Sequence, residues 1–534
     1  MHLIDHLRRL AQNPIILTGA VGLISAYIYN NQETIVKYLP KCITDRLPNV
    51  ELPEKIKSNL PNLPTLPNLP TMPSLDFAYS TAEFTSKIHE TIGNYSQYLN
   101  LINSLPQDES TVGLRVPDII NLYSDFFKCE VHTVETDDGY LLELHRIIYI
   151  GKTPLKNLKD KNIGKNRPIL LQHGVLADSS NWVLNGPDEN SLGFGLALKG
   201  YDVWMANSRG NKYSRRHVKY DPDAKVISSN LPGFSNSNHS LSKNNSSSSS
   251  MFKIEYNDNN RFWDFTWLDM ANYDQPAVVN YILKQTKFKQ LDYVGHSQGT
   301  LTMFVALHRF GLAFSEKIRK FHALAPIAWM EHIKTPLKYL SESPLGEKVV
   351  FRDWPFEILS SASNFTQNWL QEKFGSFTVD REIPIITAVV GFNPKRYKNE
   401  KMKTYMSHHR SGTSIKNIMH FAQMIRYKII PDRFLTSEQG KELDKNPCLS
   451  KNYEISLNNI QNYPTEFYLY WSDDDVFSSV PDVQKLEKLL ILNNNQVKSI
   501  GPLANFDHMS FLWGKTVFEQ LYTPLLENQD KCFT

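Results

Sequence analysis

Apolar and polar positions alternate along this chain in two ways, which together predict short strands separated by helices. Residues 131–150 (VHTVETDDGYLLELHRIIYI) read as two strands joined by a turn at 137–139, where Asp-Asp-Gly favours a tight reversal. Further short apolar runs bounded by turn residues predict buried strands at 169–172, the beginning of 201–216, 291–294, 321–329, 465–471 and 497–500. Such alternation predicts an α/β fold with a mostly parallel central sheet.

Apolar residues at helical spacing predict the helices between these strands. Asp274 has the residue type of an N-cap, and Pro276 fits the first turn of a helix that runs to Leu283. A second helical pattern occupies residues 301–311 and ends at a glycine. Residues 409–426 are expected to contain a helix, and the segment from Lys515 to about Tyr522 is expected to be a C-terminal helix.

Residues 291–300 (LDYVGHSQGT) combine a buried strand, a tight turn and the start of a helix around a G-x-S-x-G motif. Gly295 and Gly299 have no side chains, so strand and helix can approach closely and hold the Ser297 hydroxyl clear at the end of the strand. The backbone amide of Gln298 then points to where an oxyanion would form at the helix N-terminus. The motif alone arises by chance in roughly one chain in six of this length, so the competing interpretation is a glycine-rich turn with a buried serine.

A serine nucleophile needs a general base, and the base needs a carboxylate that holds its tautomer. Where this elbow occurs, the partners follow in the order serine, acid, histidine. Three consecutive aspartates, 473–475, come directly after the predicted strand 465–471, and His508 follows the last predicted strand. Spacing alone does not choose among the aspartates. The loop after strand 169–172 offers the backbone amide of Val175 as a second oxyanion donor, although His173-Gly174 can also be read as a plain strand-ending turn.

Composition narrows the function classes. The 58 basic and 55 acidic residues nearly balance among 534, so nothing indicates a nucleic-acid partner. Four scattered cysteines without C-x-x-C indicate neither a zinc site nor a disulfide framework, and the chemistry outlined above requires no metal or cofactor. The aromatic fraction of 12% suits a large apolar core or an apolar ligand.

The first part of the chain predicts an anchor and a spacer. Residues 14–29 form an uncharged apolar run preceded by Arg8 and Arg9, marginal in length for a bilayer span. We expect residues 1–30 to be an uncleaved membrane anchor, with a cleaved signal peptide as the alternative. Residues 31–112 are expected to form a proline-rich spacer and an amphipathic linker. From Pro61 to Pro73 every third residue is proline, which predicts a semi-rigid polyproline II spacer; a ligand for a proline-reading domain is the other interpretation.

The remaining residues divide into a core interrupted by insertions. We expect residues 113–326 and 463–534 to form the two parts of the α/β core. The first part contains a Ser/Asn-rich insertion, about 226–260, whose composition predicts a disordered surface loop. Residues 327–462 break the strand-helix alternation and are expected to form a cap or lid over the site, or else a separate packing domain.

Several stretches together resemble the acid lipase family, which includes gastric and lysosomal acid lipases. They are TDDGYLLELHRI, LLQHGVLADSSNWV, GYDVWMANSRGNKYS, DMANYDQPA, YVGHSQGT, SHHRSGTS and FDHMSFLWG, within about residues 115–520. The predicted anchor makes the fungal membrane-anchored steryl ester hydrolases the most similar members. The resemblance implies an α/β-hydrolase fold with an inserted cap. The Ser/Asn-rich insertion departs from the gastric and lysosomal enzymes.

The resemblance also implies roles for individual residues. Ser297 matches the nucleophile and His508 the base, while the oxyanion amides fall on Val175, where the family usually has leucine, and on Gln298. The family's acid follows a G-G-x pattern that this chain lacks, and Asp475 falls in its place, with Asp474 in reserve.

The implied activity is hydrolysis of steryl esters to sterol and fatty acid through an acyl-enzyme. Its partner would be a lipid substrate at a membrane or lipid-droplet surface, on the lipid droplet, the endoplasmic reticulum or the plasma membrane. One alternative is a triacylglycerol lipase or acyltransferase on the same fold. The other is a non-catalytic lipid-binding or tethering protein that works through the anchor and the proline-rich segment.

Overall fold

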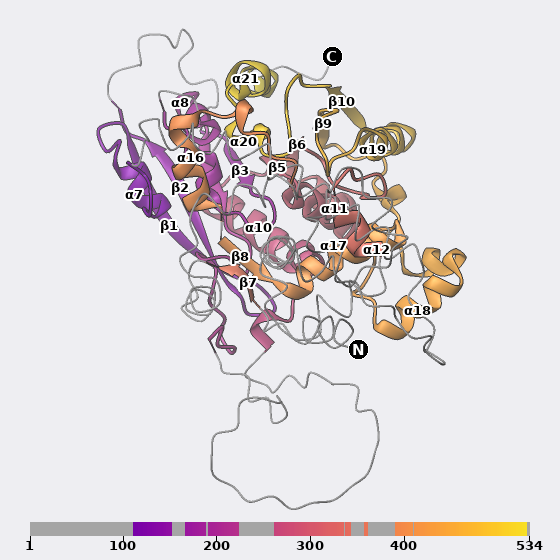
Figure 1. Ribbon diagram of the computed structural model, residues 1–534. Helices are drawn as coiled ribbons and strands as arrows, with labels where there is room; N and C mark the ends of the chain where they lie inside the picture. The colour runs from indigo at the N-terminus through magenta and orange to yellow at the C-terminus, as the bar shows by residue number, and fades with distance from the viewer. Residues whose placement is uncertain are drawn as a thin grey trace, which may run out of the picture.

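The central element is an eight-stranded sheet with the order β1-β2-β4-β3-β5-β6-β9-β10 (Figure 1). The computed structural model describes residues 110–151, 166–187, 191–223, 261–335, 337–342, 357–360, 390–409 and 411–530. The strands of the sheet are β1 Phe127–Glu135, β2 Leu141–Tyr149, β3 Pro168–Gln172, β4 Asp202–Ala206, β5 Leu291–His296, β6 Ile318–Leu324, β9 Glu466–Tyr470 and β10 Gln496–Ile500. Strand β2 pairs antiparallel with β1 and β4, and every later pair is parallel. The predicted α/β class with a mostly parallel sheet is therefore confirmed.

Helices follow the strands and cover both faces of the sheet. The α-helices of the described residues are α7 Val116–Asn121, α8 Leu192–Leu198, α9 Trp267–Asp269, α10 Gln275–Thr286, α11 Gln298–Ser315, α12 Leu337–Glu342, α16 Met402–His408, α17 Ile415–Tyr427, α18 Ser437–Lys445, α19 Val480–Leu492, α20 Ser510–Trp513 and α21 Thr523–Asp530. A separate pair of strands, β7 Glu357–Ser360 and β8 Ser411–Ser414, lies outside the main sheet.

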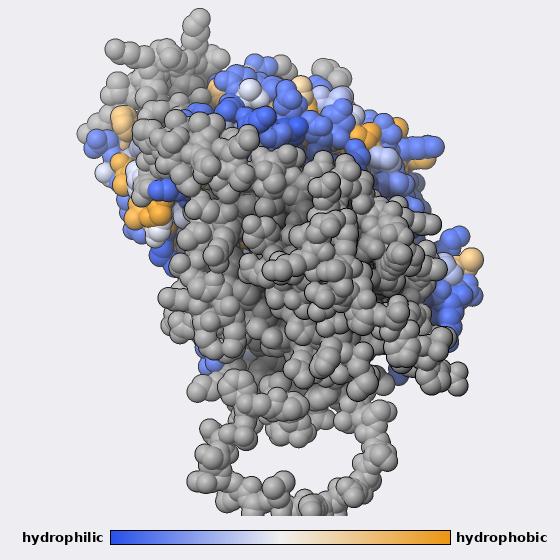
Figure 2. All heavy atoms as spheres, viewed as in Figure 1, coloured by the Kyte–Doolittle hydropathy of each residue, from blue (hydrophilic) through white to orange (hydrophobic). Residues whose placement is uncertain are grey.

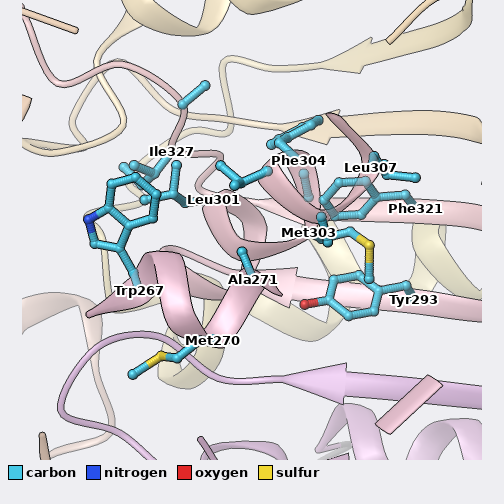
Figure 3. Close-up of a cluster of buried hydrophobic side chains, with 14 of the residues drawn as sticks. Trp267, Met270, Ala271, Tyr293, Leu301, Met303, Phe304, Leu307, Phe321 and Ile327 are labelled. Atoms are coloured by element: carbon cyan, nitrogen blue, oxygen red, sulfur yellow. The ribbon is translucent and has the colours of Figure 1, made fainter. Parts of the chain in front are cut away.

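The core has two halves because successive side chains of a strand point to opposite faces. Leu170 of β3 packs in one half with α10 and α11, whereas Ile169 and Leu171 pack in the other half with α8 and α21. Figure 3 shows part of the first half, in which Phe304 of α11 lies beside Phe321 of β6, with their ring centroids 4.8 Å apart. Burial of each such side chain contributes about 2 kcal/mol, which fixes α11 against the strands that carry the site.

Three predicted helices have different limits in the structure. Asp274 is not an N-cap: the helical segment already begins after Thr266, which forms a capping box with Asp269, and a π-helical turn continues it into α10. The Asp274 carboxylate instead accepts a 2.8 Å hydrogen bond from Arg209. The helix expected within residues 409–426 is α17, which begins at Ile415 because residues 411–414 pair with β7.

The other two corrections concern helix ends. Helix α11 does not stop at Gly311; this residue has φ 65° and interrupts the helix, which resumes to Ser315. The predicted helix from Lys515 to about Tyr522 is preceded by α20 and extends as a π-helical turn into α21. In both places the helical segment continues past the predicted end, through an interruption at Gly311 in α11 and through a π-helical turn before α21.

Hydrophilic and apolar residues gather at different places on the face of the molecule drawn in Figure 2. Figure 2 shows hydrophilic residues predominating beside α19 and α21, while apolar residues gather beside α7 and β1. Leu122, Phe126 and Val131 are exposed there. No helix among the described residues has both the length and the apolarity to cross a membrane. The predicted anchor at 14–29, the proline-rich spacer and the Ser/Asn-rich insertion lie outside the described residues.

Candidate active site

The turn after β5 holds Ser297 in a strained backbone conformation. Its φ and ψ are 53° and −119°, in a region that residues with a Cβ rarely adopt. The Ser297 amide donates to the carbonyl of Leu324 on β6 at 3.1 Å, and its carbonyl accepts from the amide and the hydroxyl of Thr300 at 2.8 and 2.7 Å. These bonds fasten the turn at both ends, so the serine hydroxyl projects from the carboxyl end of the strand.

The two glycines of the motif lie where strand, helix and the neighbouring loop approach most closely. A Cβ added to Gly299 would lie 2.5 Å from the carbonyl oxygen of Gln172, and one added to Gly295 would lie 2.9 Å from the Gly299 carbonyl. Both contacts are shorter than any that real Cβ atoms make. The first turn of α11 is therefore in direct contact with the end of β3.

The structure brings Ser297, His508 and Asp475 together from three distant parts of the chain. The Nε2 atom of His508 lies 2.8 Å from Ser297 Oγ, and Nδ1 lies 3.1 and 2.9 Å from the two Asp475 oxygens. A carboxylate only accepts hydrogen bonds, so Nδ1–H donates to Asp475 and Nε2 is left to accept from the serine hydroxyl. This is the hydrogen-bonding arrangement of an activated serine nucleophile.

Asp475 is completely buried yet is stabilised as an anion. Its Oδ1 also accepts from the amides of Phe477 and Ser478, at 2.8 and 3.0 Å. Burial favours the neutral carboxyl, but the electrostatic interaction with His508 and the hydrogen bonds from His508 and the two amides outweigh burial, so the pKa of Asp475 lies below its usual value. The ionised form therefore persists wherever the protein is folded near neutral pH.

The other two aspartates face elsewhere. Asp474 is half-exposed and accepts from Arg396 at 2.8 Å, and Asp473 contributes its backbone carbonyl to Lys334 at 3.0 Å. Of the three consecutive carboxylates, the structure places only that of Asp475 at hydrogen-bonding distance from His508.

Two residues that the sequence analysis did not single out hold the loop of His508. His296 donates from Nε2 to the backbone carbonyl of His508 at 2.9 Å, and burial together with the nearby His508 lowers the pKa of His296 to about 3, so it stays neutral. Asp507 accepts from the Asn393 amide at 2.8 Å, from the Ser510 hydroxyl at 2.9 Å and from the Tyr397 hydroxyl. Their signal in the sequence was their position, directly before the nucleophile and the base.

The loop after β3 lies against the nucleophile, because a Cβ added to Gly174 would lie 3.1 Å from Ser297 Cβ. His173 fixes the start of this loop: Nδ1 donates to the Gly174 carbonyl at 2.7 Å, and Nε2 accepts from the Ser208 amide at 3.0 Å. Within the described part of the chain, the backbone amides of Val175 and Gln298 have no hydrogen-bond acceptor. Both predicted donors therefore have N–H groups that are not used in hydrogen bonds among the described residues.

One group of possible cation ligands occurs among the described residues, away from this serine. The donor atoms of Glu331, His332 and Asp482 lie within 4.8 Å of one another. His332 and Ser479 already donate hydrogen bonds to both oxygens of Asp482, at 2.8 to 3.0 Å. These bonds account for the cluster without an ion.

Comparison with known proteins identifies the family of this chain. The model of the partial α/β-hydrolase lipase region matches residues 116–186, and that of the α/β hydrolase fold matches 167–358. The chain is 32% identical over 428 residues to lipase lipl-5 of Caenorhabditis elegans, covering 78% of this chain and 91% of that protein. It is 30% identical over 407 residues to gastric triacylglycerol lipase of Mus musculus, covering 75% and 88%, and 27% identical over 451 residues to that of Rattus norvegicus, covering 82% and 97%. The chain therefore belongs to the acid lipase family of α/β-hydrolases, and it is a carboxylic ester hydrolase.

Proposed function

We propose that Ser297, His508 and Asp475 cleave fatty acid esters by two-step acyl transfer. The observation that carries the proposal is the continuous hydrogen-bonded series from Asp475 through His508 to Ser297, with contacts of 2.9 and 2.8 Å. Ser297 Oγ attacks the ester carbonyl carbon while its proton passes to His508 Nε2. The resulting oxyanion accepts hydrogen bonds from the amides of Val175 and Gln298.

Collapse of the tetrahedral intermediate breaks the bond to the alcohol, which leaves with the proton from His508. A water molecule then attacks the acyl-serine with His508 as base, and the fatty acid is released. Asp475 remains ionised throughout, orients the imidazole and stabilises the imidazolium that forms in each step. Over the two steps, one ester bond is broken and one water molecule is consumed, and the three side chains return to their starting protonation states.

Replacement of the nucleophile tests this assignment. Ser297→Ala should lower kcat by roughly six orders of magnitude on a dispersed long-chain ester, with an unchanged melting temperature. Ser315→Ala is the matched control, because Ser315 is a buried serine at the opposite end of α11. Hydrolysis by Ser297→Ala at the rate of the control would refute the site.

For the alcohol half of the substrate we propose a sterol, which rests on the resemblance to fungal steryl ester hydrolases. Triacylglycerol is the second candidate, and the names of the rat and mouse relatives favour it. Purified enzyme offered steryl oleate and trioleate in the same mixed emulsion distinguishes them, with released sterol and diacylglycerol measured together. A preference for trioleate would replace the first proposal by the second, and a preference for short soluble esters would overturn both.

We also propose that the enzyme works at a membrane or lipid-droplet surface, anchored through residues 14–29. The support is the apolar run itself and the need to reach an insoluble ester at an interface. Carbonate extraction of membranes containing the full-length chain tests the anchor. The protein should remain in the pellet, and its release into the soluble fraction would contradict the proposal.

A further inference from the structure

Both proposed oxyanion donors are tied to the same short stretch of the inserted segment, residues 411–417. From this geometry we propose that Asn417, at the start of α17, is a positioning residue for the oxyanion hole and acts through the side chain of Gln298. The inference rests on the proposed function, since it assigns a role within that site. It names a residue that touches neither the nucleophile nor the base.

The contact between Asn417 and Gln298 is direct and buried. Asn417 Nδ2 donates to Gln298 Oε1 at 2.7 Å, and the two residues are 0% and 3% exposed. The side-chain nitrogen of Gln298, Nε2, lies 3.4 Å from the sulfur of Met270. The side chain of the residue that supplies the oxyanion amide is thus held at both ends, and Asn417 provides the stronger of the two contacts.

Asn417 is itself held in place by the residues that precede it. The Ser414 hydroxyl accepts from the Asn417 amide at 3.0 Å as the N-cap of α17, and donates to the carbonyl of Phe265 at 2.5 Å. Asn417 Nδ2 also donates to the Thr413 hydroxyl at 3.2 Å. The start of α17 is therefore fixed against the segment leading to Met270, and its position determines where Gln298 is held.

The same stretch reaches the second donor loop. The Ser411 amide donates to the carbonyl of Leu176 at 3.0 Å, and the Ser411 carbonyl accepts from the Lys212 amide at 2.8 Å. Leu176 directly follows Val175 and has a φ of 60°, so its carbonyl is a fixed point of a tightly turned loop. Residues 411–417 therefore contact both the loop after β3, which contains Val175, and the turn after β5, which contains Gln298.

This link should matter mainly in the transition state. Donors of an oxyanion hole act because they are already in place when the charge develops, and a displaced donor loses that stabilisation. An ester in its ground state gains little from the same amides, so loosening Gln298 should lower kcat much more than it changes KM. Loss of one entire donor lowers kcat about 100-fold or more. For a donor that is displaced but still present we expect kcat to fall about tenfold.

The test is a double-mutant cycle with Asn417→Leu and Gln298→Met, variants that delete the two polar groups and keep similar volumes and the Gln298 backbone amide. The Asn417 Oδ1 atom has no hydrogen-bond partner among the described residues, so leucine removes only the donor. Gln423→Leu is the matched control: it is an amide on the same helix whose bonds, at 2.8 and 3.0 Å, go to Leu435.

We expect each single variant to lose about tenfold in kcat with KM within about twofold of wild type, and the double variant to lose no more than the worse single one. Affinity for a boronic acid, which forms a tetrahedral adduct with the serine, should fall in parallel with kcat. The Gln423→Leu enzyme should keep wild-type kcat. Wild-type kcat in Asn417→Leu, or strictly multiplicative losses in the double variant, would overturn the inference.

Two further variants complete the test. Should Asn417→Leu fail to fold, Gln298→Met tests the same bond from the other side, and unchanged kcat there overturns the inference. Ser297→Ala separates this inference from the proposed function. An inactive Ser297→Ala with an unaffected Asn417→Leu defeats only the positioning role, whereas an active Ser297→Ala defeats the proposed site as a whole.

Discussion

Replacement of Gly299 by alanine probes how closely the nucleophile turn must approach the end of β3. The added Cβ would lie 2.5 Å from the Gln172 carbonyl oxygen and 3.0 Å from that of His173, both backbone atoms that no rotamer change can remove. An ordinary contact begins at 3.4 Å, so the first turn of α11 must withdraw by about 0.9 Å. Gln298 directly precedes Gly299, and Val175 lies two residues after His173, so the displacement separates the two proposed oxyanion donors.

The structure sets the size of the effect. A misplacement of about 1 Å among the reacting groups lowers the reaction rate about 100-fold. The overpacking around the added Cβ costs about 1–3 kcal/mol of stability. Alanine regains about 1 kcal/mol over glycine as a helix residue, so the loss of stability is partly offset while the loss of rate is not. Gly299→Ala should therefore be a folded enzyme with a slightly lower melting temperature and a kcat reduced by about two orders of magnitude.

Steady-state kinetics on a long-chain p-nitrophenyl ester, together with thermal denaturation, measure both effects. Gly195→Ala is the matched control, since Gly195 lies within α8 and an added Cβ meets only the tip of Leu526, at 3.8 Å. That control should retain kcat and melt at the same or a slightly higher temperature. A kcat for Gly299→Ala within about threefold of wild type would refute the claim that this approach positions the donors.

Three further predictions follow from the charged groups around the site. Asp475→Asn should lower kcat by about 10⁴-fold, because the amide no longer selects the productive tautomer of His508, whereas Asp474→Asn should leave kcat unchanged; equal effects in parallel assays would contradict the assignment of the acid. Lys212→Met should cost about 3 kcal/mol of unfolding free energy in urea, because it leaves the fully buried Asp178 without the ammonium that lies 2.9 Å away. His508→Phe should destabilise the protein at pH 7, with a deficit that shrinks toward pH 4.

The sign of that last effect follows from the pKa of one carboxyl group. In the wild-type protein the pKa of Asp475 lies below its usual value of 3.8, so its contribution to stability is present above pH 3.8 and is lost as the pH falls through the folded pKa. Without His508, burial becomes the dominant influence and raises that pKa, so the carboxylate destabilises at neutral pH and is relieved on protonation. A deficit that grows toward pH 4 would show that the pair does not control this pKa.

Much of the fold could be predicted because it follows from local patterns. The buried strands are continuous apolar runs, and the elbow at Ser297 is specified by glycines two residues before and two residues after the serine, so neither depends on distant partners. The prediction that Asp274 caps a helix was wrong for the opposite reason. Its sequence, Asp-x-Pro, is locally typical of a helix start, but the helical segment begins upstream at Thr266, and Arg209 takes the carboxylate.

The choice of the acid shows the same limit within the site. Spacing could not distinguish Asp475 from its two neighbours, because adjacent residues differ only in the direction of their side chains. That direction depends on the amides of Phe477 and Ser478, which bind Asp475, and on Arg396, which binds Asp474 from a segment far away in the sequence. Family spacing favoured Asp475, and the structure now gives the physical reason for that choice.

The contacts made by residues 411–417 were the part of the site least accessible from sequence. The stretch SHHRSGTS resembles the family, but nothing in the sequence pattern indicates that Ser411 binds the loop of Val175 or that Asn417 binds Gln298. Such contacts join residues more than a hundred positions apart, and no local propensity specifies them. If residues 411–417 position the oxyanion donors, substitutions in this stretch alter the rate of the chemical step although none of these residues belongs to the triad.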